Sequence, residues 1–521
     1  MTQKEPIWNW NYKNIVFSKY SIILGIIIGI SSLIRFYYFP FDVPLNSDAL
    51  YYFWYSSEIY QIGTLPNNWT PTNNGWPIFV SIFFSIINSE DILELMEIQR
   101  MISTIISISI TIPVYFLCKK FVERKFAIIG AVLIAFEPRL MINSFFGITD
   151  PLYLLLILTS LTLFLHSNQK IVYFSFVLVA LSSLVRSEGI VFFVGMLIIF
   201  FIRYRKEKLR IILKYILIIG IFGITILPVS LYQLDTTGTE GIVIRAAGSI
   251  EQLIEEDKKI GNEENDLVLG LEILIKYLIW IMIPNFIIFI PLGIFLIFKK
   301  RTIENISIII LSAIMLIPAF YAYFIPALDT RYLYILLPMF SILAVLSIQK
   351  ITINKPQTNL IIVIIISAII FSSIIFYEYK KIDYDHEKES FEIIQKISPI
   401  IDGTNLLYPE TSYFKTVKTL QQWPENPSNM KFDISTLSTN EYISIEEFIF
   451  NSKELGLSHI IIDNNLNREK FLTEIFFDET KYPYLKKIYD SKDDGYIYHV
   501  KVFEIDYDLF KKEQRILNSN E

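Results

Sequence analysis

The chain has 521 residues, of which 53% are hydrophobic, 15% aromatic and only 19% charged. Soluble domains average about 45–50% apolar and about 25% charged residues. Here the apolar excess is gathered in runs such as SIILGIIIGISSLI and IIVIIISAIIFSSIIFY, which approach the roughly 20 residues needed to cross a bilayer. The net charge of −6 gives no reason to expect a nucleic-acid partner, and one cysteine with four histidines makes a Cys/His zinc site improbable.

Eleven apolar stretches are predicted to be membrane-spanning helices. In chain order they are residues 20–38, 98–118, 126–143, 151–166, 171–185, 190–202, 211–231, 280–298, 306–324, 332–348 and 359–377. The shorter run 76–87 is interpreted as an interfacial or re-entrant segment. The basic N-terminus followed by an apolar run resembles a signal peptide. Its length and the lack of a small-residue cleavage site favour a retained first span.

The positive-inside rule gives these spans a direction. If residues 76–87 do not cross, the connections KKFVERK, RYRKEKLR, KKR and QKITINK all lie on the same side as the basic N-terminus. That side is predicted to be the cytoplasm. The sequence therefore predicts a multi-pass cell-membrane protein with a cytoplasmic N-terminus.

Two domains are predicted. Residues 1–377 form a transmembrane catalytic domain with outer loops at 40–97 and 235–270, and residues 378–521 form a small extracytoplasmic α/β domain. In the second domain, short apolar runs (NLLYP, HIIID, YIYHVKVFEI) alternate with amphipathic stretches such as SIEEFIFNSKELG. SKDDG is typical of a hairpin turn before the final strand, and HEKES is interpreted as a charged linker leaving the membrane.

Charged residues gather at the predicted outer ends of the spans. They are Arg35, Arg100, Glu137, Arg139, Asp150, Arg186, Glu188, Asp329 and Arg331. A charge within the bilayer costs at least about 2.5–3.5 kcal/mol, so each group needs a partner or a watery cavity. One interpretation is that they are paired or snorkelling groups that pin helix ends. Because basic residues are scarce on the outer side, an arginine-lined cavity that binds phosphate is the alternative.

An isolated carboxylate follows the first span, in the stretch PLNSDALYYFWYSSEIYQIGTLP. Ser47 is predicted to be an N-cap and Asp48 the first helical residue, where the helix dipole favours an ionised carboxylate. Tyr51 and Tyr52 follow within the next turn. The simpler interpretation is an ordinary helix start followed by an interfacial aromatic belt.

The order of these motifs resembles that of the GT-C membrane glycosyltransferases, in particular the protein O-mannosyltransferase and lipid A aminoarabinose transferase branch. SDALYY stands where that family has its acidic motif, and NGWPIFVSIFFSI, IQRMIS, FEPRLMINSFFGITDPLYLLLILTSL and DTRYLYILLPMFSILAVLSI follow in the family's order. The resemblance covers residues 41–348. Ala49 replaces the acid that often follows the first aspartate, and the signature WWDYG of the oligosaccharyltransferase branch is missing.

The resemblance implies transfer of a sugar from a polyprenyl-phosphate donor to a protein, lipid or glycan acceptor on the outer face of the membrane. Asp48 is the candidate general base of an inverting reaction. Asp150 is the second catalytic candidate; it would orient the acceptor or, with Asp48, hold a divalent cation, although a required metal is not favoured. The candidate substrate- and phosphate-binding residues are Arg331, Arg139, Arg186, Tyr51, Tyr52 and Glu137. Glu188 is expected to pair with Arg186.

Two other classes remain open. A membrane transporter or lipid-carrier flippase would also line its pathway with charges. However, the halves of the chain show no repeat, and the charges gather at one face instead of mid-span. A structural membrane protein with a partner-binding outer domain would leave Asp48 and the outer arginines without a shared purpose.

Overall fold

The computed structural model of the chain describes residues 19–66, 74–207, 209–237, 263–324, 328–397, 399–401, 405–407, 435–437, 439, 442–465 and 468–520. Most of the predicted outer loop at 235–270 lies outside the described residues. The chain divides into two compact units. The first comprises Met1–Phe39, Tyr55–Asn88 and Ile98–Tyr379, and the second Pro40–Trp54, Ser89–Glu97 and Lys380–Glu521.

The membrane part is helical, as the apolar runs predict. Its helices are α2 (Lys19–Tyr37), α3 (Ser47–Ile62), α4 (Gly75–Ile87), α5 (Ile92–Ser109), α6 (Thr111–Cys118), α7 (Arg124–Ala135), α8 (Pro138–Phe145), α9 (Asp150–Phe164), α10 (Gln169–Val185), α11 (Glu188–Tyr204), α12 (Arg210–Thr237), α14 (Glu263–Met282), α15 (Ile290–Lys299), α16 (Ile303–Phe324), α17 (Leu337–Thr352) and α18 (Thr358–Ile397), with a 3₁₀ helix η2 (Thr330–Leu336). Within the described residues six spans are long and apolar enough to cross a membrane, or seven if α7 and α8 form one bent span. The chain is therefore a polytopic helical membrane protein. The number of eleven spans stays a prediction, because several further helices are apolar but short.

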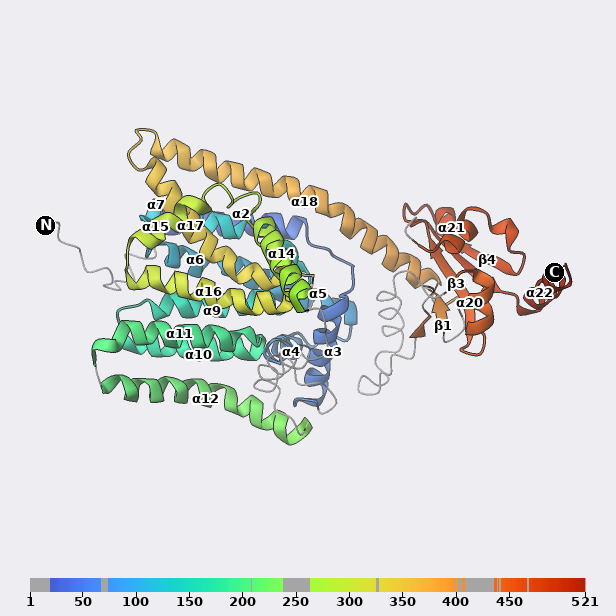
Figure 1. The fold of residues 1–521 in the computed structure, drawn as a ribbon, viewed down its shortest axis with the longest axis horizontal. Helices are drawn as coiled ribbons and strands as arrows, with labels where there is room; N and C mark the ends of the chain where they lie inside the picture. The colour runs from blue at the N-terminus through green and yellow to red at the C-terminus, as the bar shows by residue number, and fades with distance from the viewer. Residues whose placement is uncertain are drawn as a thin grey trace. The chain divides into compact units, whose positions relative to one another are not determined.

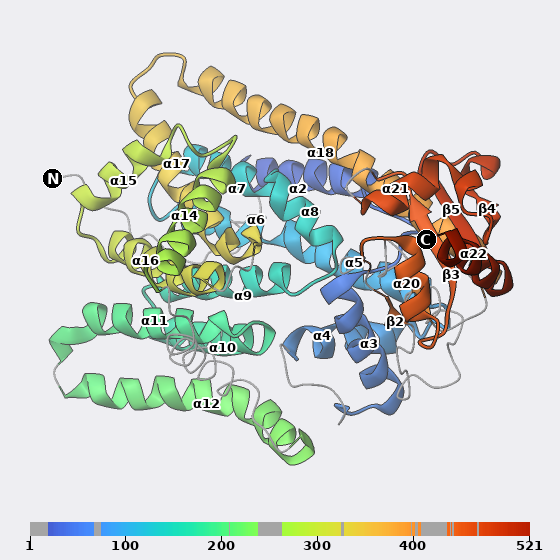
Figure 2. The same cartoon turned by 45° about the vertical axis from the view of Figure 1, so that its right-hand side comes forward.

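Helices α9, α10, α11 and α12 run side by side (Figures 1 and 2). Short connections join α9 to α10 and α10 to α11, so consecutive helices are antiparallel. Phe176 on α10 anchors the packing, with its ring centroid 5.9 Å from that of Phe164 and 6.0 Å from that of Phe193. As a result, the N-termini of α9 and α11 and the C-terminus of α10 lie at the same end of this layer.

Two of the predicted spans are interrupted. The prediction of one helix over 280–298 is wrong, because α14 ends at Met282 and α15 begins only at Ile290. The predicted span 126–143 is bent by 45° between α7 and α8. Both interruptions coincide with prolines, Pro284 and Pro138, whose rings clash with the preceding turn and which lack the N–H that a helix interior needs.

Helix α18 is longer than predicted. It covers 40 residues, Thr358–Ile397, so the charged segment HEKES is helical and continues the last span. Residues 358–397 contain neither glycine nor proline, and the polar second half is rich in Lys and Glu, which are good helix formers. The apolar first half continues without a break into this polar half.

The second unit contains a five-stranded mixed sheet of order β2-β1-β3-β5-β4. Its strands are β1 (Asn405–Leu407), β2 (Ser435–Thr436), β3 (Leu457–Asp463), β4 (Leu485–Asp490) and β5 (Val500–Ile505). Strand β1 is parallel to β2 and β3, whereas β5 is antiparallel to both β3 and β4. The α/β fold predicted for the C-terminal region is confirmed, and the SKDDG segment lies in the β4–β5 hairpin as expected.

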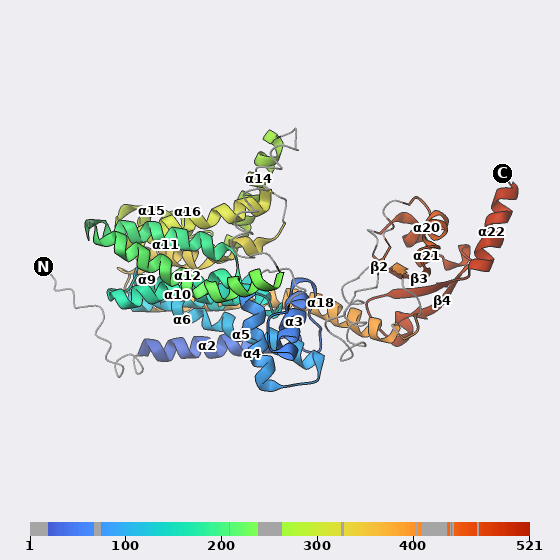
Figure 3. The same ribbon diagram turned by 90° about the horizontal axis from the view of Figure 1, so that it is seen from below.

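Alternating side chains of the sheet enter two separate cores. Ile460 and Ile462 pack with helices α20 (Ile445–Ser452), α21 (Lys470–Phe477) and α22 (Tyr507–Asn520), whereas Ile461 packs with the end of α18. Successive residues of a strand point to opposite faces, so this alternation places a helical layer on each face. Figure 3 shows α20 and α21 on one side of the sheet.

Candidate functional site

Three charged residues meet where three helix ends meet. Asp150 is the first residue of α9, Arg186 directly follows α10, and Glu188 is the first residue of α11. The N-terminus of a helix carries partial positive charge and the C-terminus partial negative charge. Each acid and the arginine therefore stand at the helix end that favours its charge.

A tight turn places Arg186 beside Glu188. Arg186 is extended, with φ −147° and ψ 136°, and its N–H still donates to the Ser182 carbonyl at 2.9 Å. Gly189 lies so close to the preceding helix that a Cβ there would be 2.6 Å from the Ser183 nitrogen. A larger residue would force α11 away from α10 and separate the two charges.

Arg186 is paired with both acids. Its Nη1 donates to Asp150 Oδ1 at 2.6 Å and its Nη2 to Glu188 Oε1 at 2.7 Å, with Nε 3.2 Å from the same Glu188 oxygen. The side chains are 13%, 4% and 19% exposed for Arg186, Asp150 and Glu188. The expected pairing of Glu188 with Arg186 is thus observed, and a second partner, 36 residues away, joins it. Within the described residues, three of the five guanidinium N–H donors are used in these bonds, which leaves two for a ligand.

A second arginine lies on the same pocket. Arg331 is in η2, where the Asp329 carboxylate accepts a hydrogen bond from the Arg331 backbone N–H at 2.8 Å and one from its Nε. The Tyr323 hydroxyl fixes this turn by donating to the Asp329 carbonyl at 2.9 Å. The Arg331 side chain is 28% exposed, so its head group is accessible as well as anchored.

These charges line one small pocket within the first unit. Its lining residues are Asp150, Tyr153, Leu154, Arg186, Glu188, Met315, Pro318, Arg331, Tyr332, Tyr334 and Ile335. Two of the lining residues carry a buried polar atom that has no hydrogen-bond partner among the described residues. The two atoms are Asp150 Oδ2 and the Tyr153 hydroxyl.

Arg139 and Glu137 form a different cluster, outside the lining of this pocket. The Arg139 guanidinium is 3.0 Å from Glu137 Oε1 and donates to the carbonyls of Trp280 and Ile283, each at 2.8 Å. These carbonyls lie at the end of α14, where a helix lacks its own donors. Arg139 therefore caps the C-terminal end of α14 in this structure. A phosphate-binding role for it stays a prediction.

Two further rim arginines also hold helix ends. The buried Arg35 guanidinium donates to the Ala135 carbonyl at 2.7 Å, at the break between α7 and α8. Arg100 Nε donates to the Phe145 carbonyl at 2.6 Å, at the end of α8. For these arginines the interpretation as groups that pin helix ends describes the geometry.

The acidic motif belongs to the second compact unit. Asp48 is exposed and lies in the first turn of α3. The N-cap prediction is wrong by one residue, because the Asn46 carbonyl accepts the first helical bonds, from Ala49 and Leu50, and Ser47 is already helical. The backbone can start its turn at Asn46 because Asn is as good an N-cap as Ser. A shared pocket for Asp48 and Arg331 stays a prediction.

Tyr51 and Tyr52 follow on the same helix. Tyr52 is buried and Tyr51 is half-buried. Their rings make an edge-to-face contact at 5.9 Å. Packing of this kind is what the aromatic-belt interpretation expects, and a role in substrate binding stays a prediction.

The acids of the pocket do not fit a cation site by themselves. Asp150 Oδ1 and Glu188 Oε1 both accept hydrogen bonds from Arg186. Among the described residues, no three His, Cys, Asp or Glu side chains are grouped so that they could hold a metal. A cation shared by Asp48 and Asp150 stays a prediction.

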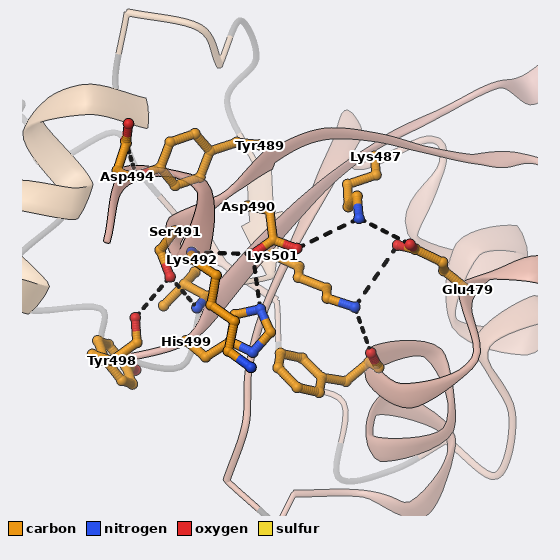
Figure 4. Close-up of polar contacts among 12 residues, drawn as sticks. Glu479, Lys487, Tyr489, Asp490, Ser491, Lys492, Asp494, Tyr498, His499 and Lys501 are labelled. Carbon is orange, nitrogen blue, oxygen red and sulfur yellow. Dashed lines mark hydrogen bonds and ion pairs between the residues drawn. The ribbon is translucent and has the colours of Figure 1, made fainter. Parts of the chain in front are cut away.

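The C-terminal domain contains a serine, a histidine and an aspartate close together (Figure 4). His499 Nε2 is 2.8 Å from Asp490 Oδ1, but the fully buried Ser491 hydroxyl donates to the Tyr498 carbonyl and accepts from the Val500 N–H. A nucleophilic serine needs a hydroxyl bonded to its base. Here the hydroxyl closes the β4–β5 hairpin instead, so the cluster is structural.

Neither protein-family models nor the sequences of curated proteins match this chain. Its structure, by contrast, is similar to solved membrane glycosyltransferases. ArnT from Cupriavidus metallidurans bound to undecaprenyl phosphate has a TM-score of 0.57 and 10% identity, covering 94% of this chain and 98% of that one. The oligosaccharyltransferase AglB from Archaeoglobus fulgidus, in complex with an inhibitory peptide and a dolichol-phosphate, has a TM-score of 0.53 and 14% identity, covering 90% and 73%. The chain therefore has a GT-C-like fold, as the motif order predicted.

Sequence reasoning did not select Tyr153. It lies three residues after Asp150, so both side chains project from one face of α9, and its ring centroid is 5.8 Å from the Arg186 guanidinium carbon. The i, i+3 spacing was the available signal. Tyr332 and Tyr334, which also line the pocket, lie one and three residues after Arg331 in sequence.

Proposed function

We propose that this protein is a membrane glycosyltransferase that moves a sugar from a polyprenyl-phosphate-linked donor to a protein, lipid or glycan acceptor. The observation that carries the proposal is the pocket lined by Arg186 and Arg331, in which Arg186 is paired with Asp150 and Glu188 at helix ends. It lies in a fold shared with ArnT, whose solved structure holds undecaprenyl phosphate. Identity is low, so the donor class is inferred from the chemistry of the pocket together with this likeness.

The reaction we propose is a direct displacement. The acceptor hydroxyl attacks the anomeric carbon, the bond from that carbon to the phosphate oxygen breaks, and the polyprenyl phosphate leaves with the electron pair. Attack opposite to the leaving group inverts the anomeric centre. Negative charge grows on the leaving phosphate, and the Arg331 head group and the two remaining N–H donors of Arg186 would stabilise it.

The acceptor's proton must go to a base. Asp48 is our candidate, because an ionised carboxylate in the first turn of a helix is stabilised by the dipole and remains available to accept a proton. General-base catalysis is typically worth about 10²–10⁴-fold in rate. We place this chemistry and the C-terminal domain on the outer face, because the basic connections mark the other side as cytoplasmic.

A transporter or flippase remains the alternative class. It would move the carrier lipid without breaking the sugar–phosphate bond. The pocket lies at the ends of α9, α10 and α11 instead of halfway along them, and a surface-facing enzyme fits this position better than a mid-membrane substrate pathway does.

The test offers purified protein a panel of polyprenyl-phosphate sugars together with a membrane extract that supplies acceptor hydroxyls, and it follows loss of sugar from the carrier. We expect wild type to consume at least one donor and Asp48→Asn to lose about 100-fold or more of that rate. Asp42→Asn is the matched control, since Asp42 is another exposed acid of the same segment and pairs with Lys388 at 3.3 Å; it should retain activity. Carrier movement without cleavage of any donor would favour the transporter.

A further inference from the structure

Two buried polar atoms of the pocket-lining residues take no part in the ion pairs described above. Asp150 uses one carboxylate oxygen for Arg186, but its other oxygen, Oδ2, has no partner within the described residues. The Tyr153 hydroxyl, one turn later on α9, has none either. Asp150 is 3% exposed and Tyr153 4%. Buried polar groups are almost always satisfied in folded proteins, so two together point to a missing ligand group or water.

The hydrogen-bonding properties of these two atoms restrict which ligand group could satisfy both. A carboxylate oxygen accepts hydrogen bonds and cannot donate, whereas a tyrosine hydroxyl can do either. A ligand group that donates to Asp150 Oδ2 and accepts from Tyr153 would satisfy both atoms. A sugar hydroxyl can do this, and an amine can at least donate. A phosphate oxygen cannot, because beside a carboxylate it would bring like charges together.

Aromatic side chains complete this part of the pocket. Tyr153, Tyr332 and Tyr334 line it together with Asp150. Tyr334 differs from Tyr153 in that its hydroxyl is 3.3 Å from the Thr330 hydroxyl. Aromatic rings beside a carboxylate suit a polar ring with apolar faces better than they suit a lipid tail.

We infer that Asp150 and Tyr153 form a subsite for the transferred sugar, in which they bind one hydrogen-bond-donating substituent of its ring. Arg331 and the remaining donors of Arg186 then meet the phosphate on the other side of the bond that breaks. This inference rests on the proposed function. It divides one pocket into a sugar side and a phosphate side, and it makes Tyr153 a residue that determines donor specificity.

The experiment measures kcat/KM for a polyprenyl-phosphate hexose and for analogues in which each ring hydroxyl in turn is removed or replaced by an amine. For wild type we expect the loss of one particular hydroxyl to cost at least about tenfold, because the site's buried polar groups are then left unpaired. In Tyr153→Phe this penalty should shrink at that position alone. Tyr334→Phe is the matched control and should keep the wild-type pattern of selectivity.

Asp150→Asn provides a second measurement. An amide presents a donor as well as an acceptor, so Asp150→Asn should change which analogue is preferred, beyond a uniform fall in rate. If an amine at the recognised position is used better than the hydroxyl by wild type but not by Asp150→Asn, the natural substituent is an amine. The reverse preference in wild type indicates a hydroxyl.

The outcomes separate the two proposals. If wild type consumes no donor, the proposed function fails. If wild type is active but tolerates every deoxy analogue equally, or if Tyr153→Phe leaves the penalty unchanged, the sugar subsite is wrong and a buried water satisfies the two atoms. The glycosyltransferase activity would then stand by itself.

Discussion

The protein contains the same trio of residue types twice. In the membrane pocket, Asp150 pairs with Arg186 near Tyr153; in the C-terminal domain, Asp463 pairs with Arg468 near Tyr498. Both aspartates are buried, at 3% and 4% exposed. The two trios therefore have the same residue types and nearly the same burial of the aspartate. They differ in how the aspartate is hydrogen-bonded.

In the C-terminal trio every carboxylate oxygen is used. Arg468 donates to Asp463 from Nε at 3.1 Å and from Nη2 at 2.9 Å, the Tyr498 hydroxyl donates at 2.9 Å, and the Asn465 N–H at 3.3 Å. In the pocket trio, Asp150 Oδ2 and the Tyr153 hydroxyl have no partner among the described residues. A saturated buried acid stabilises the fold, whereas an unsaturated one that lines a pocket can bind something else.

The largest expected contrast is between Asp150→Asn and Asp463→Asn. The first should lower the transfer rate by about 100-fold, because it weakens the ion pair that positions Arg186 and alters the sugar contact. The second should leave the rate within about threefold, yet lower the stability of the C-terminal domain by about 2 kcal/mol, since hydrogen bonds to a charged group are lost. Donor turnover and thermal unfolding of both variants measure this. Equal loss of activity in the two variants would break the comparison.

The next contrast concerns the arginines. Arg331→Ala should raise the KM for the donor by about tenfold or more, because a charge-assisted bond to phosphate is worth roughly 1.5–3 kcal/mol. Arg331→Lys should recover part of the loss, since the charge remains but the fork geometry does not. Arg468→Ala should leave KM unchanged. A KM that is insensitive to Arg331 would remove this residue from the phosphate side of the pocket.

Removing the hydroxyl of each tyrosine should have a different effect on the stability of the protein. Tyr498→Phe should cost about 1–2 kcal/mol of the free energy of unfolding of the C-terminal domain, because its hydroxyl donates to Asp463. Tyr153→Phe should cost nothing measurable in stability without substrate, since its hydroxyl makes no bond within the described part of the chain. Chemical denaturation of the two variants against wild type decides this. A destabilised Tyr153→Phe would mean that its hydroxyl already has a partner.

The smallest expected effect is the pH dependence of the C-terminal domain. Burial by itself would raise the pKa of Asp463, but hydrogen bonds from Arg468 and Tyr498 outweigh it and hold the pKa below its usual range. Because the folded carboxyl binds its proton less readily than the unfolded one, its contribution to stability is complete above about pH 4 and is lost as the pH falls further.

His499 should add a second pH-dependent change in the stability of the C-terminal domain, at higher pH than that of Asp463. Burial lowers its pKa below 6.5 in spite of the neighbouring Asp490. The unfolded chain therefore takes up this proton first, and stability should decline as the pH falls through about 6.5. Hydrogen exchange of strands β3 to β5, corrected for the intrinsic rate, follows both steps. His499→Gln should remove the upper step and leave the lower one; a variant that keeps both steps would contradict the assignment.

Much of the candidate site could be read from short-range spacing. Glu188 pairs with Arg186 as expected, and Arg139 with Glu137 and Arg331 with Asp329 are likewise paired two residues apart. Side chains two residues apart in a turn lie within reach of each other, and for the buried Arg139–Glu137 pair burial makes the pairing obligatory. Which of these arginines lines the pocket could not be predicted in this way, because Arg139 and Arg186 both lie two residues from an acid but have different surroundings.

The sequence by itself determined the membrane class, most helix positions and the alternating strands of the C-terminal sheet, because hydrophobic length and period act locally. Tertiary structure alone decided that Asp150 meets Arg186 across 36 residues. It also decided that, within the described part of the chain, one Asp150 carboxylate oxygen and the Tyr153 hydroxyl have no partner, and that Arg139 bonds the end of α14 instead of lining the pocket. These outcomes depend on which helix ends come together in packing, and helix packing involves side chains that are far apart in the chain.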